Sequence, residues 1–182
     1  MSKINIFCFG FGQVAEGFIN KLIQEKKDFD LSITSRQETH QIEINNLKVS
    51  SFQFSHDKFD SSIKKQLEEA NYILISIPPI EGRDIAANYL DKNLINIKNC
   101  KWITYLSATS VYGDHKGEWV NENSITKPTS TNGLSRLAAE NTWKELSIKN
   151  KYPLQIFRLA GIYSNEFNIL RRLQAGRAQI VD

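Results

Sequence analysis

Short apolar runs alternate along this chain with longer stretches in which apolar residues recur at helical spacing. The runs have the length and nearly continuous apolar character of buried parallel strands, as over residues 72–77. The longer stretches repeat apolar residues every three or four positions, as Val14, Phe18 and Leu22 do. We expect strands at 4–9, 28–35, 71–77, 101–107 and 153–159, a helix directly after the first strand, and helices at 61–70, 82–97, 131–149 and 168–176.

The stretch 37–60 is less regular than the rest of the chain. Ile42, Ile44, Leu47 and Val49 alternate loosely with polar residues, which predicts one or two short strands. Everywhere else strand and helix patterns follow one another in turn, which predicts right-handed crossovers between parallel strands. The expected fold class is α/β, with a doubly wound, mostly parallel sheet of the Rossmann type.

The predicted helix at 131–149 begins after a run of residues that can cap it. Ser130, Thr131 or Asn132 can accept a hydrogen bond from the first helical N–H groups. Its apolar positions predict a buried face. The face we expect comprises Leu134, Leu137, Ala138, Trp143 and Leu146.

Two glycines and an alanine follow the first apolar run. Gly10 can adopt turn geometry that a side chain forbids, and Gly12 leaves room for a diphosphate to approach the backbone. Ala15 is small enough to let the following helix pack on the strand, and the amides of Gln13 and Val14 lie at the helix N-terminus, where anions are favoured. This G-x-G-x-x-A pattern predicts dinucleotide binding; the alternative is a glycine turn without a ligand.

The end of the second strand bears on which dinucleotide is bound. NAD sites carry an acidic residue there for the ribose hydroxyls, whereas this chain has Ser35 followed by Arg36. A guanidinium pairs well with a 2′-phosphate, so the sequence favours NADP over NAD. Glu38 is the rival candidate for the ribose, and a solvated loop arginine is the alternative for Arg36.

Loops that leave the carboxyl ends of parallel strands line the ligand crevice of this fold class. Ser76, Ile77 and Pro78 follow the strand at 71–77, and Ser107 ends the strand at 101–107. These four residues are therefore candidates for contact with the cofactor.

Composition narrows the class of partner. The formal net charge of +3 is small and no basic block occurs, so no nucleic-acid partner is expected. Cys8 and Cys100 form no metal-binding pattern and no disulfide framework. No signal peptide or membrane-length apolar run is found, so we expect a cytoplasmic protein with a small-molecule partner. The sequence does not indicate an oligomeric state.

Six segments occur in one order along the chain, and residues 111–114 and 158–163 are the most specific among them. The six are 9–15, 34–36, 76–79, 105–114, 138–140 and 157–163. Together they resemble the extended or atypical short-chain dehydrogenase/reductase superfamily, the NAD-dependent epimerase/dehydratase group, and within it the nucleoside-diphosphate-sugar epimerase type. The resemblance implies NADP or NAD as cofactor and a nucleotide-sugar substrate.

The resemblance also implies a catalytic Ser or Thr, a Tyr and a Lys, of which the lysine also holds the nicotinamide ribose. Here the tyrosine and lysine positions fall on Asn132 and Arg136, and the serine position falls on Ala108. An amide cannot transfer a proton as a phenol does, and a guanidinium cannot act as a base. The remaining catalytic candidates are Thr109, Tyr112 and Arg136, and Arg136 is also a cofactor candidate.

Members of this superfamily continue with a C-terminal substrate domain beyond the position of Asp182. The resemblance thus implies that 1–182 is a single NAD(P)-binding Rossmann-like domain whose substrate domain is truncated or missing. Three functions follow: an NADP-dependent oxidoreductase or an epimerase (isomerase) with an altered triad, a catalytically inactive dinucleotide-binding sensor or scaffold, and an interaction subunit that keeps only the fold.

Overall fold

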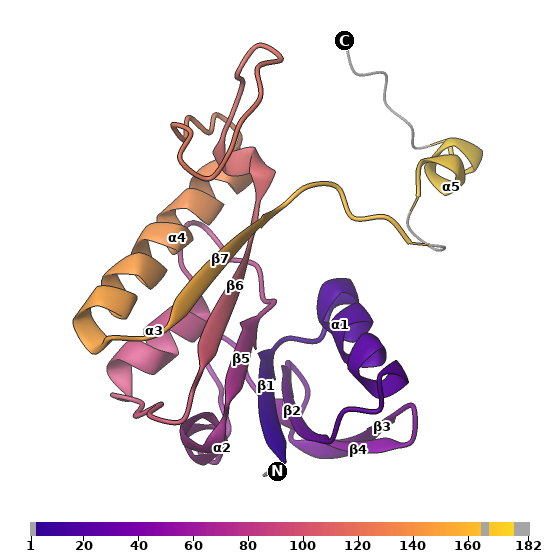
Figure 1. Ribbon diagram of the computed structural model, residues 1–182, viewed down its shortest axis with the longest axis vertical. Helices are drawn as coiled ribbons and strands as arrows, with labels where there is room; N and C mark the ends of the chain where they lie inside the picture. Colours follow the sequence, from indigo (N-terminus) through magenta and orange to yellow (C-terminus); the bar gives the residue numbers. More distant parts are fainter. Residues whose placement is uncertain (1–2, 165–167, 177–182) are drawn as a thin grey trace.

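The computed structural model of the protein describes residues 3–164 and 168–176, and strands and helices alternate along it as predicted (Figure 1). The elements are β1 (Ile4–Phe9), α1 (Gln13–Gln24), β2 (Phe29–Ser35), β3 (His40–Ile44), β4 (Leu47–Gln53), α2 (Ile63–Glu69), β5 (Tyr72–Ile75), α3 (Ile85–Lys92), β6 (Trp102–Ala108), the 3₁₀ turn η1 (Thr109–Val111), α4 (Thr131–Asn150), β7 (Leu154–Leu159) and α5 (Ile169–Gln174).

The strands form one seven-stranded sheet in the order β3-β4-β2-β1-β5-β6-β7. Only β3 runs antiparallel to its neighbour, β4, and the other five pairings are parallel. The expected α/β class with a mostly parallel sheet is confirmed. Because six strands run the same way, their carboxyl ends all lie along one edge of the sheet.

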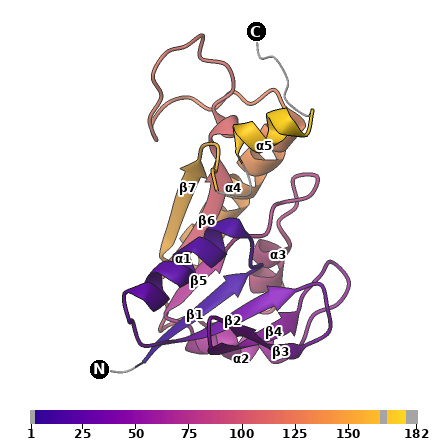
Figure 2. The same ribbon diagram turned by 90° about the vertical axis from the view of Figure 1, so that its right-hand side faces the viewer.

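Helices cover the two faces of the sheet unequally (Figures 1 and 2). α2, α3 and α4 lie on one face, where they bury a large cluster around Phe7, Ile75 and Trp143. On the opposite face α1 packs over β1 and β2, with Ala15 and Ile19 fully buried. Phe18, predicted on the buried face of α1, is instead 45% exposed. This asymmetry leaves β6 and β7 without a helix on the α1 side.

The segment between β5 and α3 differs from the prediction. β5 ends at Ile75, and α3 begins at Ile85 rather than at residue 82. Ile80 and Arg83 exchange both backbone hydrogen bonds across a two-residue turn, in which Glu81 and Gly82 have φ values of 49° and 76°. This tight hairpin uses the residues that would have formed the first helical turn.

Helix α3 is also shorter than predicted at its C-terminal end. Asp84 caps its start, since its Oδ1 accepts a hydrogen bond from Ala87 N at 2.9 Å. Lys92 ends the helix, and Leu94 then adopts a left-handed backbone with φ of 47°. Apolar spacing alone predicted five further helical residues beyond Lys92.

Helix α4 begins as predicted, and its inward face agrees in part with the expected one. The hydroxyl of Ser130 accepts a hydrogen bond from Gly133 N at 3.1 Å, which confirms Ser130 as the cap. Leu134 and Ala138, predicted to be buried, are exposed. Trp143 and Leu146 are buried as predicted, and the other buried residues are Gly133, Ala139 and Glu140. The small residue Gly133 lets the start of α4 approach η1 closely.

The approach of α4 to η1 is closest at Gly133. A Cβ atom at this position would lie 2.5 Å from Ser110 O and 2.8 Å from Pro128 Cβ. The first of these neighbours is backbone, which cannot rotate away. The contact between α4 and η1 thus requires a residue without a side chain.

A buried carboxylate joins α4 to β6 and β7. Glu140 is fully buried, and its carboxylate accepts hydrogen bonds from Arg158 Nε at 3.0 Å and Arg158 Nη2 at 2.8 Å. Ser107 Oγ donates to the same carboxylate at 2.6 Å, and Lys144 Nζ lies 3.6 Å from it. Burial by itself would raise the pKa of Glu140, but these donors and charges hold that pKa below its ordinary value.

The close approach at Gly133 predicts that Gly133→Ala destabilises the fold. Overpacking of this kind costs about 1–3 kcal/mol. Gly17→Ala is the matched control, because a Cβ there meets nothing within 4 Å and alanine is the better helix former by about 1 kcal/mol. Relative to the wild type, the midpoint of urea denaturation should therefore fall for Gly133→Ala and rise for Gly17→Ala. Equal stability of Gly133→Ala and the wild type would contradict the close approach.

The ion pair at Glu140 predicts that Glu140→Gln destabilises the fold by about 3–5 kcal/mol, because Arg158 is left buried without its anion. The lowered pKa of Glu140 means that its contribution is fully present above the unfolded value of about 4.3 and is lost as the pH falls through the folded value. Denaturant unfolding at neutral pH and at successively lower pH values measures this loss. The wild type should lose more stability in acid than the variant does, and parallel curves would contradict the assignment.

Candidate functional site

The backbone turn at the end of β1 is built from Gly10 and a buried threonine. Gly10 has φ of 77°, in the left-handed region that favours glycine. Its N–H donates to Thr34 Oγ1 at 2.8 Å, and Thr34 is 2% exposed at the end of β2. The turn is therefore held by a strand that is distant in sequence.

Helix α1 starts directly after this turn with its first N–H groups available. Gly12 is the N-cap residue and has no side chain to accept their hydrogen bonds, and none of the described side chains caps this helix. Free amides at a helix N-terminus form a site for anions such as phosphate. The buried Nε2 atom of Gln13 also has no hydrogen-bond partner among the described residues. Val14 follows it, and Ala15, fully buried, packs the helix onto β1.

The loop after β5 lies against the glycine turn. Ser76 N donates to Phe9 O at 2.9 Å, so this loop is tied to the end of β1. A Cβ atom at Gly10 would lie 3.0 Å from Ile77 Cγ1, and one at Gly12 would lie 3.6 Å from Ser76 Oγ. Pro78 follows and is exposed. The missing Cβ atoms thus leave the backbone of the turn uncovered on the side that faces Ser76 and Ile77.

The predicted ribose-binding residues lie at the neighbouring end of β2. Ser35 Oγ accepts hydrogen bonds from Gln37 N at 3.3 Å and from Ser51 Oγ at 3.2 Å. Arg36, the next residue, is exposed at the same edge of the sheet. The rival residue Glu38 is also exposed, two positions further along. Arg36 thus lies directly after β2, and its role towards a ribose or 2′-phosphate stays a prediction.

The carboxyl end of β6 carries the next group of predicted site residues. Ser107 is 3% exposed and directs its hydroxyl to Glu140, whereas Ala108 is half-buried and Thr109 is exposed. On α4, Arg136 Nη1 donates to Leu106 O at 2.5 Å. The guanidinium of Arg136 is therefore anchored to the end of β6.

Asn132 and Tyr112 are two further residues named from the sequence. Asn132 is exposed in the first turn of α4. Tyr112 is 7% exposed, with the guanidinium carbon of Arg158 4.8 Å from the centre of its ring. Because the same guanidinium pairs with Glu140, the Tyr112 ring belongs to the packed wall formed by η1, α4 and β7.

Sequence reasoning did not assign roles to several residues that build the site. Thr34 holds the glycine turn, and Glu140 with Arg158 fixes the wall. Ser135 Oγ accepts a hydrogen bond from Gly82 N at 2.8 Å, which ties the 80–83 hairpin to α4. The role of Thr34 could have been predicted from the sequence, because it is a polar residue inside a predicted buried strand. A buried hydroxyl needs a hydrogen-bond partner.

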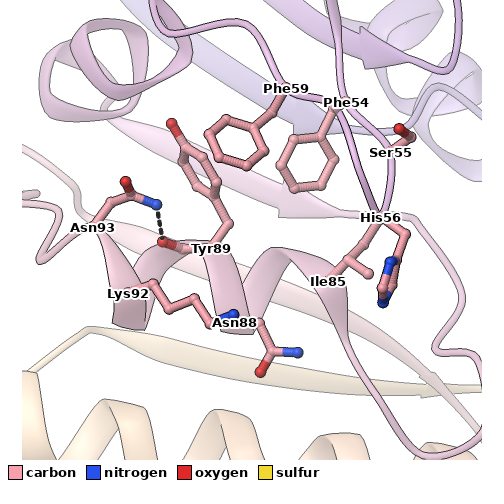
Figure 3. Close-up of a pocket in the computed structure, with 9 residues that line it drawn as sticks. All are labelled: Phe54, Ser55, His56, Phe59, Ile85, Asn88, Tyr89, Lys92 and Asn93. Atoms are coloured by element: carbon pink, nitrogen blue, oxygen red, sulfur yellow. Dashed lines mark hydrogen bonds between the residues drawn. The ribbon is translucent and has the colours of Figure 1, made fainter.

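A separate hollow of about 340 Å³ lies between α3 and the loop that follows β4 (Figure 3). Tyr89 forms edge contacts with Phe54 and Phe59 at ring-centre distances of 5.4 and 5.0 Å. His56 and Lys92 add polar groups to its lining. The predicted cofactor residues do not line this hollow, whose lining comes from 54–59 and 85–93.

Within residues 3–164 and 168–176 there is neither a group of metal-ligating side chains nor a helix that could span a membrane. No group of three or more His, Cys, Asp or Glu side chains there is placed to hold a metal ion. None of the described helices has the length and apolar character needed to cross a membrane.

Cys8 is fully buried, which raises its pKa to about 12.

No protein-family model matches this sequence, and no curated protein is similar enough to count as a relative. Solved structures with this fold are numerous. A functionally unknown conserved protein from Silicibacter pomeroyi DSS superposes with a TM-score of 0.67 at 28% identity, over 87% of this chain and 52% of its own.

Two epimerases share the fold at lower identity. UDP-glucuronic acid 4-epimerase from Bacillus cereus, solved with NAD, superposes with a TM-score of 0.67 at 15% identity, over 87% of this chain and 56% of its own. UDP-N-acetylglucosamine 4-epimerase from the same organism gives 0.63 at 19% identity, over 93% of this chain and 66% of its own. The protein thus has the fold of the NAD-dependent sugar-nucleotide epimerases and spans between half and two thirds of the length of these structures.

Proposed function

We propose that this protein binds a nicotinamide dinucleotide across the carboxyl edge of its sheet. The uncapped start of α1 at Gly12, beside the left-handed turn at Gly10, carries the proposal. The amides of Gln13, Val14 and Ala15 would hold the diphosphate, with Ser76, Ile77 and Pro78 on its other side. In this proposal 1–182 is one dinucleotide-binding domain.

The second part of the proposal concerns the form of the dinucleotide. Arg36 is exposed directly after β2, where a guanidinium can pair with a 2′-phosphate, and this favours NADP. The UDP-glucuronic acid 4-epimerase with this fold was solved with NAD, which favours NAD instead, at 15% identity to this chain. Ser35 and Arg36 are the residues that decide between the two forms.

The third part concerns catalysis on a nucleotide sugar. A bound nicotinamide would accept or donate a hydride at a hydroxyl or carbonyl of the substrate. Of the candidate residues, Thr109 is exposed and could donate a hydrogen bond to such an oxygen, and Arg136 supplies a positive charge nearby. The UDP-sugar epimerases with this fold support a nucleotide-linked substrate and membership of the short-chain dehydrogenase/reductase superfamily.

Binding without turnover is the second candidate function. Asn132 and Ala108 stand where the superfamily has its tyrosine and serine, and Tyr112 is packed beneath Arg158. A sensor or scaffold needs the glycine turn but not an acid/base residue. Incubation with UDP-sugars, followed both by chromatography of the sugars and by nicotinamide absorbance, separates the two candidates: a reductase changes the absorbance, an epimerase returns the hydride and forms an isomer without a net change in absorbance, and a sensor does neither.

Replacing Gly12 tests the diphosphate site. Gly12 has φ of −89°, which any residue adopts, so Gly12→Val should fold normally while its side chain projects towards Ser76 and covers the backbone of the turn. Calorimetric titration and thermal shift with NADP and NAD should show binding to the wild type and a loss of at least tenfold in the variant. Gly17→Ala, on the same helix, is the control that keeps binding. Unchanged affinity in Gly12→Val would remove the proposed site.

Replacing Arg36 tests the choice of cofactor. The wild type should bind NADP at least tenfold more tightly than NAD, because the guanidinium pairs with the 2′-phosphate. Arg36→Ala should lose that difference and leave NAD affinity nearly unchanged. Comparing the two dissociation constants at low and high salt adds a control, since an exposed ion pair weakens with screening. Equal affinities in the wild type would instead favour NAD, as in the epimerase neighbour.

A further inference from the structure

Three polar side chains are buried together where α3 and α4 cover β6. Asp84, Tyr105 and Trp143 are 4%, 0% and 1% exposed. One polar atom of each has no hydrogen-bond partner among the described residues, namely Asp84 Oδ2, the hydroxyl oxygen of Tyr105 and Trp143 Nε1. Tyr105 pairs with Ile75, the last residue of β5, so the group lies next to the carboxyl edge of the sheet. Unpaired buried polar atoms are costly, and packing alone does not explain three of them in one place.

Asp84 belongs to this group because it caps α3. Its Oδ1 accepts a hydrogen bond from Ala87 N at 2.9 Å, and Oδ2 of the same carboxylate takes no part in the cap. The hairpin directly before Asp84 is tied to α4 by the hydrogen bond from Gly82 N to Ser135 Oγ at 2.8 Å. The start of α3 therefore lies against the first turns of α4, which carry Arg136 next to Ser135.

The charges in this group act on one another. Burial raises the pKa of Asp84, while the indole N–H of Trp143 and the positive charge of Arg136 act to lower it. Burial likewise raises the pKa of Tyr105 to about 12, with Asp84 adding to the rise and Arg136 opposing it. Asp84, Tyr105 and Trp143 thus surround one side of Arg136 with a buried carboxylate and two polar groups.

Arg136 connects this buried group to the candidate site. The side chain is half-buried, and Nη1 donates to Leu106 O at 2.5 Å. Leu106 follows Tyr105 on β6, close to the carboxyl edge where we propose that the dinucleotide binds. The guanidinium therefore experiences the buried carboxylate while one of its N–H groups is fixed to the end of β6.

We propose that Asp84 is a positioning residue for Arg136: its carboxylate holds the guanidinium at the carboxyl edge, oriented to donate to the nicotinamide ribose of a bound dinucleotide. This proposal rests on the function proposed above. Asp84 itself does not touch the cofactor and acts only through Arg136. A guanidinium stays charged and transfers no proton, so Arg136 serves to bind and orient. A buried opposite charge keeps such a long side chain in one orientation, as a binding site requires.

Asp84→Asn removes the charge and little else. Asparagine is an equally good N-cap residue, so α3 should keep its start and the variant should fold. Calorimetric titration with NADP and with NAD at about pH 9 should show a loss of affinity of at least tenfold. Asp91→Asn is the matched control, because Asp91 lies near the other end of α3 and also faces α4, 2.8 Å from Lys149 Nζ. The control should bind both dinucleotides as the wild type does.

The pH profile of binding separates a positioning role from a purely structural one. Because the pKa of Asp84 is raised, its carboxylate takes up a proton at a higher pH than an ordinary aspartate, whose pKa is about 3.9. Wild-type affinity should therefore be highest above this raised pKa and fall towards that of Asp84→Asn as the pH drops through it. A constant ratio of the two affinities from about pH 9 to about pH 5 would contradict the proposal.

The other titrating groups do not imitate this profile. Arg136 keeps its charge throughout, and Tyr105 stays neutral because burial raises its pKa. Glu140, which also acts on Tyr105, has a pKa below its ordinary value and stays ionised. The histidines and the 2′-phosphate of NADP titrate alike in both proteins. The ratio of the two affinities thus isolates Asp84.

A double variant tests whether Asp84 acts through Arg136. Arg136→Gln should weaken binding of both dinucleotides at least tenfold. Adding Asp84→Asn to it should cause no further loss, because the side chain that Asp84 positions is gone. Losses that multiply in the double variant would mean that the two residues act independently, and would overturn the proposal.

Failure of this proposal and failure of the proposed function give different results. A wild type that binds neither NADP nor NAD would overturn both. A wild type that binds, together with unchanged affinity and pH profile in Asp84→Asn, would overturn the positioning role alone. Circular dichroism at each pH checks that the proteins are folded. If Asp84→Asn does not fold, Asp84→Ser replaces it, since a serine hydroxyl also caps a helix.

Discussion

The parallel pairing of β1 with β2 on one side and β5 on the other is the constraint on which the candidate site depends. Because the three strands run in one direction, their carboxyl ends lie side by side, and hydrogen bonds join each end to its neighbour. The hydroxyl of Thr34 at the end of β2 accepts from Gly10 N, and the carbonyl of Phe9 accepts from Ser76 N. The left-handed turn and the open start of α1 follow from these pairings.

The other wall of the site depends on a buried charge. Glu140 receives the guanidinium of Arg158 and the hydroxyl of Ser107, and so joins α4 to β6 and β7. Removing water from a carboxylate is costly, and only this full set of donors offsets the cost. The guanidinium of Arg158 also lies 4.8 Å from the centre of the Tyr112 ring, so the same group holds Tyr112 in place.

The helices cover the two faces of the sheet unequally. On one face three helices bury Ile103 and Tyr105 completely, whereas on the other face α1 packs over β1 and β2 and leaves Trp102 and Phe157 half exposed. The part of the described sheet formed by β6 and β7 is therefore covered less than the strands that carry the glycine turn.

The sequence by itself determined the α/β class, the order of strands and helices, the glycine turn and the start of α4, whereas the structure selected Ser130 among three candidate caps. These features depend on residues within a few positions of one another. On α4 it predicted Trp143 and Leu146 correctly as buried and Leu134 and Ala138 wrongly, because the packing of Gly133 against Ser110, 23 positions away, is not visible in a local pattern. The 80–83 hairpin was missed because the helical apolar spacing was extended back to residue 82, where Glu81 and Gly82 have positive φ values that apolar spacing does not encode.

The tertiary structure alone decided what the polar site residues contact. The hydroxyl of Ser107 meets a carboxylate 33 positions away, and the guanidinium of Arg136 meets a carbonyl 30 positions away. Such partners follow from strand order and helix packing, which no local pattern encodes. For the same reason the lesser covering of β6 and β7 became visible only once the helices were placed on the sheet.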